Sequence, residues 1–329
     1  MKEQHILITG NAGFIGSNLC EYLLCEDVMH GKNVKVTGLD RDKTHKEFLA
    51  SCFKSKNFHQ LWGDINNIED HCDKLIDVDT IYHLAAAADI RASLKNTNAD
   101  LTDNTIGTHS ILEFMRKRDI KNLVFSSTSS IYGIAPIVPT PEDIPDIRPI
   151  SQYAASKFGA EAFINAYCSL YGIRARMYRF ANVVGKNMHR GVIWDFIHKL
   201  QQNPNELEIL GNGKQEKSLF DVSDCIRGFV EISKSDGIKP CDVYNLGNVN
   251  TITVRKIADV VCDDLGVKPV YNFTGGDCGW KGDTPYTILS ISKAEHAGWS
   301  PTYSCVETIH RAVFDICQRE KIKKIAKHE

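Results

Sequence analysis

The sequence has no run of apolar residues near the ~18 that a helix needs to span a membrane. It also has no internal repeat and no low-complexity stretch, and its 39 basic and 41 acidic side chains leave a net charge of −2. These absences exclude a membrane-embedded or disordered chain and any general attraction to nucleic acid. We therefore expect a soluble globular protein that binds anions only locally.

The 11 cysteines include no Cys-x-x-Cys pair, the spacing typical of metal and redox motifs. Buried thiols in a reducing compartment account for such a set better than disulfides do. The polar start, Met1 to Gln4, leads straight into an apolar segment without the features of a signal peptide. The sequence thus predicts no metal site and a cytoplasmic location.

That apolar segment, His5 to Thr9, has the short, β-branched pattern of a buried parallel strand. It is followed by three glycines spaced three apart and then by a helical pattern; the glycines are Gly10, Gly13 and Gly16. A strand, a tight glycine turn and a helix N-terminus together direct backbone N–H groups at a pyrophosphate. This context predicts a dinucleotide site.

A second strand, Asn33 to Leu39, ends in Asp40. A carboxylate at this place accepts hydrogen bonds from the adenosine ribose and repels a 2′-phosphate, which favours NAD over NADP. The neighbouring Arg41 argues the other way, because an arginine pairs well with phosphate. We expect NAD, with NADP as the open alternative.

Predicted strands and helices alternate to about residue 180, as in a doubly wound parallel sheet. The segments expected after Asp40 are a polar helix near Thr44 to Cys52, strands near Phe58 to Trp62, Thr80 to Leu84, Leu123 to Ser126 and Arg174 to Arg179, and helices near Asp103 to Arg118 and Ser151 to Tyr171. The pattern predicts an α/β fold with a Rossmann-type domain over residues 1–181, which a return segment near 218–247 rejoins. Residues 182–329 are expected to form mainly a smaller, mixed α/β domain that binds the substrate.

Tyr153 and Lys157 are four residues apart on a predicted helix that Ser151 caps, so they share one face. A free phenol has a pKa near ~10 and is a poor base at neutral pH. A nearby ammonium and the positive ring of an oxidised nicotinamide favour the phenolate, and together they can supply the ~4 kcal/mol that a shift to neutral pH takes. The pair therefore predicts a proton-transfer site.

Several ordered motifs make the chain resemble, over almost its whole length, the extended short-chain dehydrogenase/reductase family of nucleotide-sugar epimerases and dehydratases. These motifs are the glycine turn, Asp40, Asp64-Ile65, His83-Leu84-Ala85-Ala86, Asn104, Phe125 to Thr128 leading to Tyr132-Gly133, Tyr153 with Lys157, and Arg179 to Gly185. The resemblance implies an NAD-dependent enzyme that oxidises the C4 hydroxyl of a nucleotide-diphosphate sugar.

The same resemblance implies three catalytic residues. Tyr153 would be the acid and base, Lys157 would hold the nicotinamide ribose and make Tyr153 more acidic, and Thr128 would bond the reacting sugar oxygen. The cofactor would lie against Tyr153, Lys157 and a further set formed by Gly10, Gly13, Phe14, Ile15, Gly16, Asp40, Asp64, Ile65, Leu84, Ala85, Ala86, Asn104 and Ser126. Asn104 would support the active-site backbone.

The substrate would be bound by Arg91, Thr128, Asn182, Lys217 and Lys281. Lys217 stands where relatives often have arginine. Relatives usually have a second arginine at or just before the turn that follows Cys278, where this chain has the cysteine, and Lys281 is the candidate replacement for that arginine. Arg91 suits the carboxylate of a uronic acid, although a phosphate contact or a surface charge stays open. Thr287 lies near the place where the epimerases of this family resemble one another in a residue whose bulk limits the substituent on C2 of the sugar. Because threonine is of intermediate size, both a plain hexose and an N-acetyl sugar stay open as substrates.

Relatives that eliminate water or decarboxylate resemble one another in an acidic residue shortly before the tyrosine of the Tyr132-Gly133 step, where this chain has Ser129 and Ser130. The sequence is therefore most similar to the 4-epimerases, in which the 4-keto intermediate is reduced again on its opposite face. We expect a UDP-hexose, UDP-N-acetylhexosamine or UDP-uronic acid as substrate. The alternatives are a 4,6-dehydratase, a 4-dehydrogenase/reductase and a non-catalytic NAD-sensing regulator on the same fold.

The two helices expected near residues 103–118 and 151–171 resemble the pair through which many relatives form a two-fold, four-helix interface. The resemblance therefore implies a homodimer.

Overall fold

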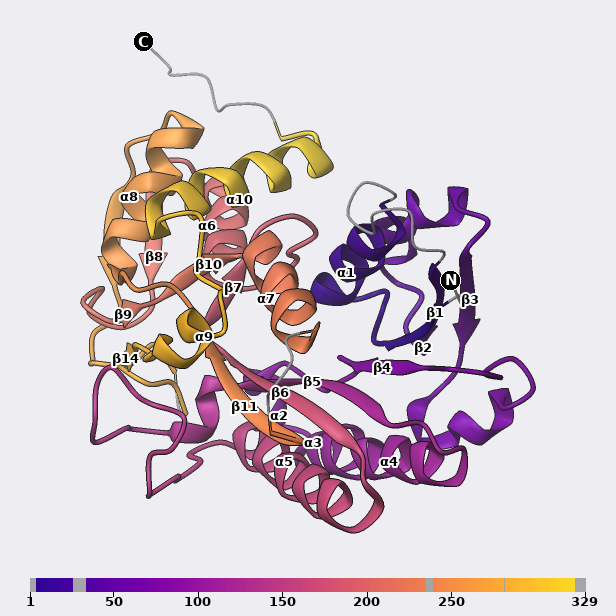
Figure 1. The fold of residues 1–329 in the computed structure, drawn as a ribbon. Coiled ribbons are helices and arrows are strands. Elements are labelled where there is room, and N and C mark those ends of the chain that lie inside the picture. The colour runs from indigo at the N-terminus through magenta and orange to yellow at the C-terminus, as the bar shows by residue number, and fades with distance from the viewer. Residues whose placement is uncertain (1–3, 26–33, 235–238, 281, 323–329) are drawn as a thin grey trace. The chain divides into compact units, whose positions relative to one another are not determined.

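A seven-stranded sheet with the strand order β11-β6-β5-β4-β1-β2-β3 is the framework for the N-terminal half of the chain (Figure 1). The structure, a computed structural model, describes residues 4–25, 34–234, 239–280 and 282–322. The strands of this sheet are β1 (Gln4–Thr9), β2 (Val34–Asp40), β3 (Phe58–Trp62), β4 (Thr80–His83), β5 (Asn122–Thr128), β6 (Arg174–Phe180) and β11 (Cys241–Leu246). Strand pairs β1–β2, β2–β3, β1–β4 and β4–β5 are parallel, which confirms the predicted α/β fold class.

The order of the strands reverses between β1 and β4, because β2 and β3 lie on one side of β1 and β4 lies on the other. Such a reversal opens a crevice at the carboxyl ends of the two central strands, where ligands of doubly wound sheets bind. Gly10 directly follows β1 and Leu84 directly follows β4. Both predicted cofactor motifs therefore lie at the crevice.

Helices cover both faces of the sheet (Figure 1). α1 (Phe14–Leu24) and the last turns of α7 (Val222–Lys234) lie on one face, and α4 (Gly107–Lys117) and α5 (Gln152–Tyr171) lie on the other. Leu7, Ile81 and Phe125 from the strands pack with Ile111 and Ile164 from the helices in one buried core. This core fixes α5 beneath the sheet, so the place of its polar residues is set by apolar packing.

The start and end of α5 follow local rules. Ser151 caps the helix by accepting a hydrogen bond from the backbone N–H of Ala154, and Gly172 ends it in the left-handed conformation with a φ of +68°. The helix predicted from Ser151 to Tyr171 is thus confirmed.

Short helical segments connect the remaining strands of the sheet. They are η1 (Lys46–Leu49), η2 (Cys52–Lys54), η3 (Ile65–His71), α2 (Ile90–Ser93), α3 (Thr97–Asp100), η4 (Leu101–Ile106) and η5 (Ser129–Tyr132). The prediction of one helix near Thr44 to Cys52 is wrong, because η1 and η2 are separate 3-10 turns. Only Phe48, Leu49 and Cys52 are buried in these two turns, and a regular helix needs a larger packed face. The helix predicted from Asp103 instead begins as a π-helical turn, η4, and becomes regular only at Gly107.

The C-terminal half forms small sheets and packed helices. The sheets pair β7 (Asn182–Val184) with β10 (Leu219–Asp221), β8 (Glu206–Ile209) with β13 (Val270–Phe273), and β9 (Glu216–Lys217) with β12 (Ile252–Thr253) and β14 (Tyr286–Thr287). The helices are α6 (Val192–Gln202), α8 (Val254–Leu265), α9 (Ser292–His296) and α10 (Cys305–Glu320). α8 packs against both α6 and α10.

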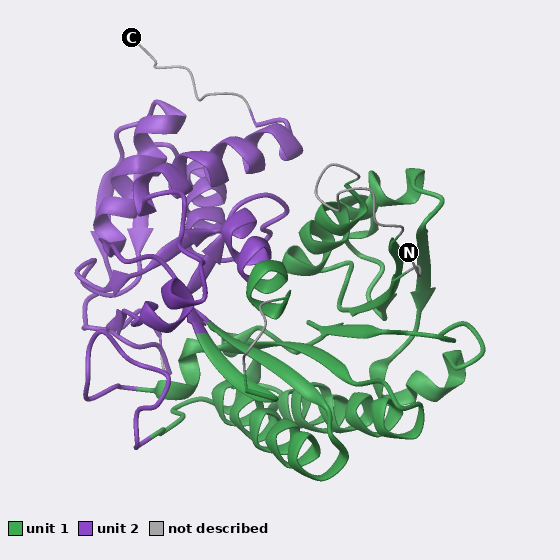
Figure 2. Ribbon diagram, viewed as in Figure 1, with its two compact units in different colours: residues 1–133, 147–179, 229–244 green, residues 134–146, 180–228, 245–329 purple. Residues whose placement is uncertain are grey.

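The chain divides into two compact units (Figure 2). Unit 1 comprises residues 1–133, 147–179 and 229–244, and unit 2 comprises residues 134–146, 180–228 and 245–329. Compared with the domains expected from sequence, the segment 134–146 joins unit 2 and the segment that returns to unit 1 is 229–244. Among the described helices, none has the length and apolar character needed to cross a membrane.

Candidate functional site

The glycine-rich turn after β1 leaves no room for side chains. Gly10 has a φ of +71°, and a Cβ at this position would lie 2.6 Å from the backbone nitrogen of Ala85. A Cβ at Gly16 would lie 2.2 Å from the carbonyl oxygen of Gly10. Gly13 is the N-cap of α1, and within the described residues no side chain caps that helix end. The turn therefore presents unshielded backbone N–H groups at the crevice, which fits the pyrophosphate of a dinucleotide.

Phe14 and Ile15 begin α1 directly after this turn, so the structure brings them to the same helix N-terminus. Leu84, Ala85 and Ala86 follow β4 on the other side of the crevice, where the N–H of Leu84 donates to the carbonyl of Thr9. All the predicted cofactor residues in these two segments thus lie at the strand reversal.

Asp40 lies at the end of β2, and its carboxylate supports the turn. Oδ2 accepts a hydrogen bond from the N–H of Ala12 at 2.9 Å, and Oδ1 accepts one from the N–H of Asp42 at 2.9 Å. Burial raises the pKa of Asp40 although these bonds oppose the change. The residue predicted to bind the ribose therefore also ties β2 to the glycine turn.

Arg41 is held by two carboxylates. It donates to Oδ1 of Asp103 at 2.9 Å and to Oδ2 of Asp64 at 3.1 Å, and it makes a second contact with Asp103 through Nη2. The hydrogen bond with Asp103, although burial opposes it, raises the pKa of Arg41 further above its usual value. Because these carboxylates neutralise its charge, Arg41 does not offer a ready partner for a 2′-phosphate, which agrees with NAD.

Asp64 and Ile65, predicted to bind the cofactor, lie where β3 passes into η3. Asp64 caps η3 by accepting a hydrogen bond from the N–H of Asn66, and Ile65 is buried. The ion pair with Arg41 is therefore an addition to the predicted role of Asp64.

The buried amine of Lys157 lies at the end of β5. Its Nζ donates to the carbonyl oxygen of Ser126 at 2.8 Å and lies 4.6 Å from the centre of the Phe125 ring. Burial lowers the pKa of Lys157 to about 7, while the carboxylate of Glu161 acts in the opposite direction. The protonation state of this lysine is therefore sensitive to its neighbours at neutral pH.

Tyr153 and Thr128 complete the predicted catalytic set within unit 1. Tyr153 lies one helical turn before Lys157 near the start of α5, and Thr128 is the last residue of β5. The hydroxyl of Thr128 accepts a hydrogen bond from the N–H of Ser130 and donates one to its Oγ, both at 3.1 Å. The end of β5 and the first turns of α5 thus supply all three predicted catalytic residues.

Asn104 ties the loop after β4 to α5. Its Oδ1 accepts a hydrogen bond from the N–H of Ala87 at 2.8 Å, and its Nδ2 donates to the carbonyl of Ala87 at 3.1 Å and to Oγ of Ser156 at 2.9 Å. π-helical turns such as η4 occur often at functional sites because the extra residue redirects a side chain. These contacts support the backbone-positioning role predicted for Asn104.

A buried ion pair between Glu161 and Arg179 lies beneath these residues, and sequence reasoning gave it no role. Nη2 of Arg179 is 2.6 Å from Oε2 of Glu161, and both side chains are at most 5% exposed. Oε1 of Glu161 also accepts a hydrogen bond from Ser127. One signal was present in the sequence: Glu161 repeats the four-residue spacing of Tyr153 and Lys157, so all three share a helix face.

The predicted substrate residues are divided between the units. Arg91 is exposed on α2 in unit 1, whereas Asn182 lies at the start of β7 in unit 2 and donates from Nδ2 to the carbonyl of Ser218 at 3.2 Å. Lys217 is buried in unit 2, where its Nζ lies 2.9 Å from Oδ1 of Asp283. Because this ion pair neutralises Lys217, the positive charge predicted to bind the substrate is already balanced. Lys281 lies outside the described residues.

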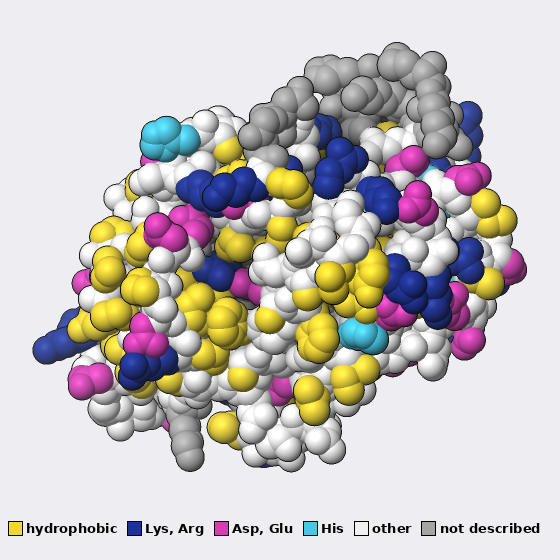
Figure 3. Space-filling model, turned by 60° about the horizontal axis from the view of Figure 1, so that its bottom comes forward, with side chains coloured by type: hydrophobic (Ala, Val, Ile, Leu, Met, Phe, Trp, Pro, Cys, Tyr) yellow, Lys and Arg dark blue, Asp and Glu magenta, His cyan; other side chains and the backbone are white. Residues whose placement is uncertain are grey.

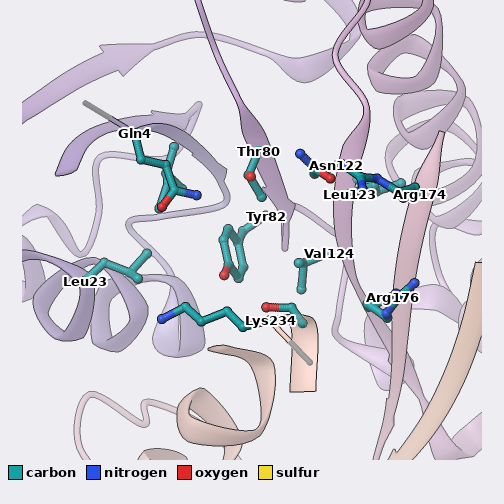
Figure 4. A pocket seen from close by; sticks show the side chains of 12 residues that line it. Gln4, Leu23, Thr80, Tyr82, Asn122, Leu123, Val124, Arg174, Arg176 and Lys234 are labelled. Atoms are coloured by element: carbon teal, nitrogen blue, oxygen red, sulfur yellow. The ribbon is translucent and has the colours of Figure 1, made fainter. Parts of the chain in front are cut away.

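A polar cavity of about 310 Å³ lies within unit 1, at the opposite edge of the sheet (Figure 4). Tyr82 stands in its middle, with Gln4 on one side and Arg174 on the other, and four lining residues, Gln4, Thr80, Asn122 and Arg174, are each the first residue of their strand. Ligands of doubly wound sheets bind at the carboxyl ends, so this cavity is not the predicted cofactor site. Among its basic residues, Lys234 is the last residue of α7, where a cation balances the helix dipole.

In the part of the chain that the structure describes, no group of three or more His, Cys, Asp or Glu side chains is arranged to hold a metal ion. All 11 cysteines are free thiols.

Comparison with known proteins gives consistent matches. Residues 6–247 match the model of the NAD dependent epimerase/dehydratase family. The UDP-glucuronate 4-epimerase of Thermodesulfobacterium geofontis is 33% identical over 94% of this chain and 95% of its own length.

Solved structures extend the similarity. A UDP-galactose 4-epimerase is 32% identical, with a TM-score of 0.83 over 96% of this chain and 99% of its own. The dTDP-glucose 4,6-dehydratase DesIV of Streptomyces venezuelae, solved with NAD, is 25% identical, with a TM-score of 0.88 over 97% of this chain and 98% of its own.

Proposed function

Because the chain belongs to the NAD-dependent epimerase/dehydratase family, we propose that it inverts C4 of a UDP-linked sugar through a 4-keto intermediate. Similarity to 4-epimerases of UDP-glucuronate and UDP-galactose supports this reaction. NAD, the cofactor of the family, supplies a hydride acceptor that can return the same hydride when it is bound. Gly10, Gly13, Gly16 and Asp40 would hold it at the strand reversal.

The residues of the chain move and hold the proton. Tyr153 takes the proton of the C4 hydroxyl and later returns it to the oxygen on C4. Lys157 favours the phenolate of Tyr153 by its charge, and the hydroxyl of Thr128 holds the reacting oxygen. Net atoms and electrons are unchanged over one turnover, so the product differs from the substrate only in configuration.

The side chains near the end of β5 favour epimerisation over elimination. Elimination of water needs an acid and base that can reach C5 and C6. Ser129 and Ser130 occupy the expected place of that group, and Glu161 is occupied by bonds from Ser127 and Arg179. Hydroxyls are poor proton acceptors at neutral pH, so Ser129 and Ser130 do not supply the base that elimination needs.

Turnover in deuterium oxide tests this choice. A 4-epimerase moves hydride from C4 and back to C4, so we expect a 4-epimer with no deuterium on carbon, formed without added NAD. A 4,6-dehydratase, which the likeness to DesIV keeps as the second candidate, would place solvent deuterium on C5 and release one water. A 4-dehydrogenase would accumulate the 4-keto sugar and consume added NAD. Either result would overturn the proposal.

The sugar is best sought among UDP-glucuronate, UDP-glucose and UDP-N-acetylglucosamine. Arg91 follows the strand that lines the crevice and suits a C6 carboxylate, and Thr287 is small enough to leave an N-acetyl group open. If Arg91 binds the carboxylate, Arg91→Gln raises KM for UDP-glucuronate by about tenfold and leaves UDP-glucose unaffected. Equal effects on both sugars would assign Arg91 to a phosphate or to the surface instead.

A homodimer is the proposed assembly, formed through the face that α4 and α5 present. Figure 3 shows hydrophobic side chains among charged ones on this side of the molecule. Ile106, Phe163, Leu170 and Tyr171 are between 42% and 70% exposed on η4 and α5, a patch typical of protein interfaces. Sedimentation should give twice the 36.9 kDa chain mass, and Leu170→Glu should shift the equilibrium toward the monomer.

The proposed location is the cytoplasm. The free state of all 11 cysteines supports a reducing compartment. Cell fractionation with an antibody against the chain would test this, and recovery from a secreted fraction would contradict it.

A further inference from the structure

The ion pair between Glu161 and Arg179 joins four elements that surround the candidate catalytic residues. Glu161 lies on α5 and Arg179 near the end of β6, where Nε donates to Oε1 at 3.0 Å and Nη2 donates to Oε2 at 2.6 Å. Ser127 near the end of β5 donates to Oε1 at 2.5 Å. The remaining Nη1 of Arg179 donates to the hydroxyl of Tyr132 on η5 at 3.0 Å. The carboxylate thus receives three hydrogen bonds in a fixed, two-pronged geometry.

Two of these residues, Ser127 and Glu161, are next to groups that the proposed reaction uses. Ser127 stands between Ser126, whose carbonyl holds Lys157, and Thr128. Glu161 follows Lys157 by one helical turn and Tyr153 by two, on the same face of α5. The hydrogen bond from Ser127 to Glu161 therefore fixes the distance between the strand that carries Thr128 and the helix face that carries Tyr153 and Lys157, while the ion pair with Arg179 ties the same helix to β6.

Global stability is a poor explanation for such a pair. Removing two charges from water costs free energy that their attraction often fails to offset, and apolar side chains of similar size are frequently as good or better. The side chains of Glu161 and Arg179 are 3% and 5% exposed, so this cost applies to both. A role in positioning α5 and in placing a negative charge near Lys157 accounts better for this ion pair.

We propose that Glu161 and Arg179 are positioning residues for the reaction: their ion pair holds the carboxylate of Glu161 where it bonds Ser127, which fixes α5 against the end of β5, and this carboxylate keeps Lys157 positively charged. The inference rests on the proposed proton transfer by Tyr153. It adds two residues that touch neither substrate nor cofactor and act only through Lys157 and the backbone of β5.

The charged and titratable groups around Lys157 set the direction of the effect. Glu161 and Tyr153 are on its own helix, His83 faces it from β4, and Arg179 with Tyr132 lies on the far side of Glu161. Burial keeps His83 neutral, with its pKa lowered to about 3. Glu161 is therefore the negative charge in this set that opposes the loss of the proton from Lys157.

Two substitutions at Glu161 separate charge from position. Glu161→Gln keeps the shape and removes the charge, so Lys157 loses its proton more readily and the phenol of Tyr153 becomes harder to ionise. We expect kcat to fall at least tenfold, with KM for the UDP-sugar changed less than threefold, and the alkaline limb of the kcat profile to move to lower pH. Glu161→Asp keeps the charge and should leave the pH profile in place while kcat falls.

A spectroscopic measurement makes the test independent of the sugar. With ¹³C at Cζ of tyrosine and NAD bound, the Tyr153 signal, assigned from Tyr153→Phe, reports the ionisation of its phenol. We expect its midpoint to rise by about one pH unit in Glu161→Gln, equivalent to the tenfold loss in rate. The control Glu69→Gln, which removes an exposed ion pair with Lys117 in the same unit, should leave the midpoint unchanged.

The double variant Glu161→Gln/Arg179→Met covers the case in which the single variant does not fold, because it leaves no unpaired buried charge. It should fold, bind NAD and still lose at least tenfold in kcat. An unchanged Tyr153 midpoint together with normal kcat in folded Glu161→Gln or in the folded double variant would overturn the inference. Absence of epimerase activity in the unaltered protein, with the midpoint shift present, would instead overturn the proposed function alone.

Discussion

Nζ of Lys157 donates a hydrogen bond to the carbonyl oxygen of Ser126 across 2.8 Å, with almost no exposure to solvent. The contact directs the amine to the backbone of β5. Burial of the amine makes its charged form less favourable. An amine with a pKa of about 7 is costly to keep protonated, and this cost is justified only if the charge is used.

Replacing that amine should separate stability from function. The pKa of Lys157 is about 7 in the folded chain against 10.5 for the free group. Between these values the unfolded chain binds more protons, so this lysine makes the unaltered protein less stable toward pH 7 than toward pH 10. Lys157→Met should therefore weaken NAD binding and abolish turnover, yet melt no lower at pH 7. The gain in melting temperature over the unaltered protein should shrink as the pH rises, and a large loss of stability at pH 7 would contradict this account.

Tyr153→Phe should leave the cofactor site intact. The substitution removes only the hydroxyl that transfers the proton, so turnover should fall by at least ~10²-fold. NAD affinity, followed by quenching of tryptophan fluorescence, should change little. Tyr171→Phe at the other end of α5 is the matched control, and near-normal activity of Tyr153→Phe would remove the assigned base.

Gly16→Ala should prevent dinucleotide binding. Its Cβ would meet the Gly10 carbonyl at 2.2 Å, so either the turn or α1 has to move. Gly159→Ala on α5 serves as the control, because the nearest atom to its Cβ is 3.6 Å away and alanine favours a helix by about 1 kcal/mol. Calorimetry should give no NAD binding for the first variant and normal binding with equal or greater stability for the second.

Acid should destabilise the protein partly through His83. This imidazole bonds Oγ1 of Thr9 at 2.7 Å and of Thr108 at 3.0 Å, and burial lowers its pKa from 6.5 to about 3. Between these values only the unfolded chain takes up the proton, so stability falls with decreasing pH by ~1.4 kcal/mol per unit. In His83→Gln, which does not titrate, the slope of unfolding free energy between pH 6 and pH 4 should be smaller by that amount. Equal slopes would show that His83 is accessible to protons.

The pattern of the sequence predicted the sheet and the cofactor crevice because their signals are local. The apolar strand before Gly10, the carboxylate after β2 and the cap at Ser151 each fix their structure within a few residues. Arg41 and Asp103 are 62 positions apart, so the sequence did not reveal their pairing. Without this pairing, Arg41 favoured NADP as the cofactor.

Other features depend on contacts that periodicity does not encode. The π-helical turn at Asn104 is stabilised by bonds to Ala87 and Ser156, which reach it from a loop and from another helix. The ion pair of Lys217 with Asp283 likewise joins distant segments, and it balances the charge of a lysine that the sequence predicted to bind the substrate. The buried network of Glu161 was missed because the one signal, its spacing from Lys157, is common on any helix.

The path of the chain between its units has an evolutionary consequence. The chain passes from one unit to the other at five places, after residues 133, 146, 179, 228 and 244. A single recombination event near residue 180 would take the part of unit 1 within residues 1–179 from one parent gene and β11, the edge strand of the same sheet, from the other. Point substitutions keep both units of one parent intact, whereas exchange of a contiguous half mixes strands of one sheet from two parents.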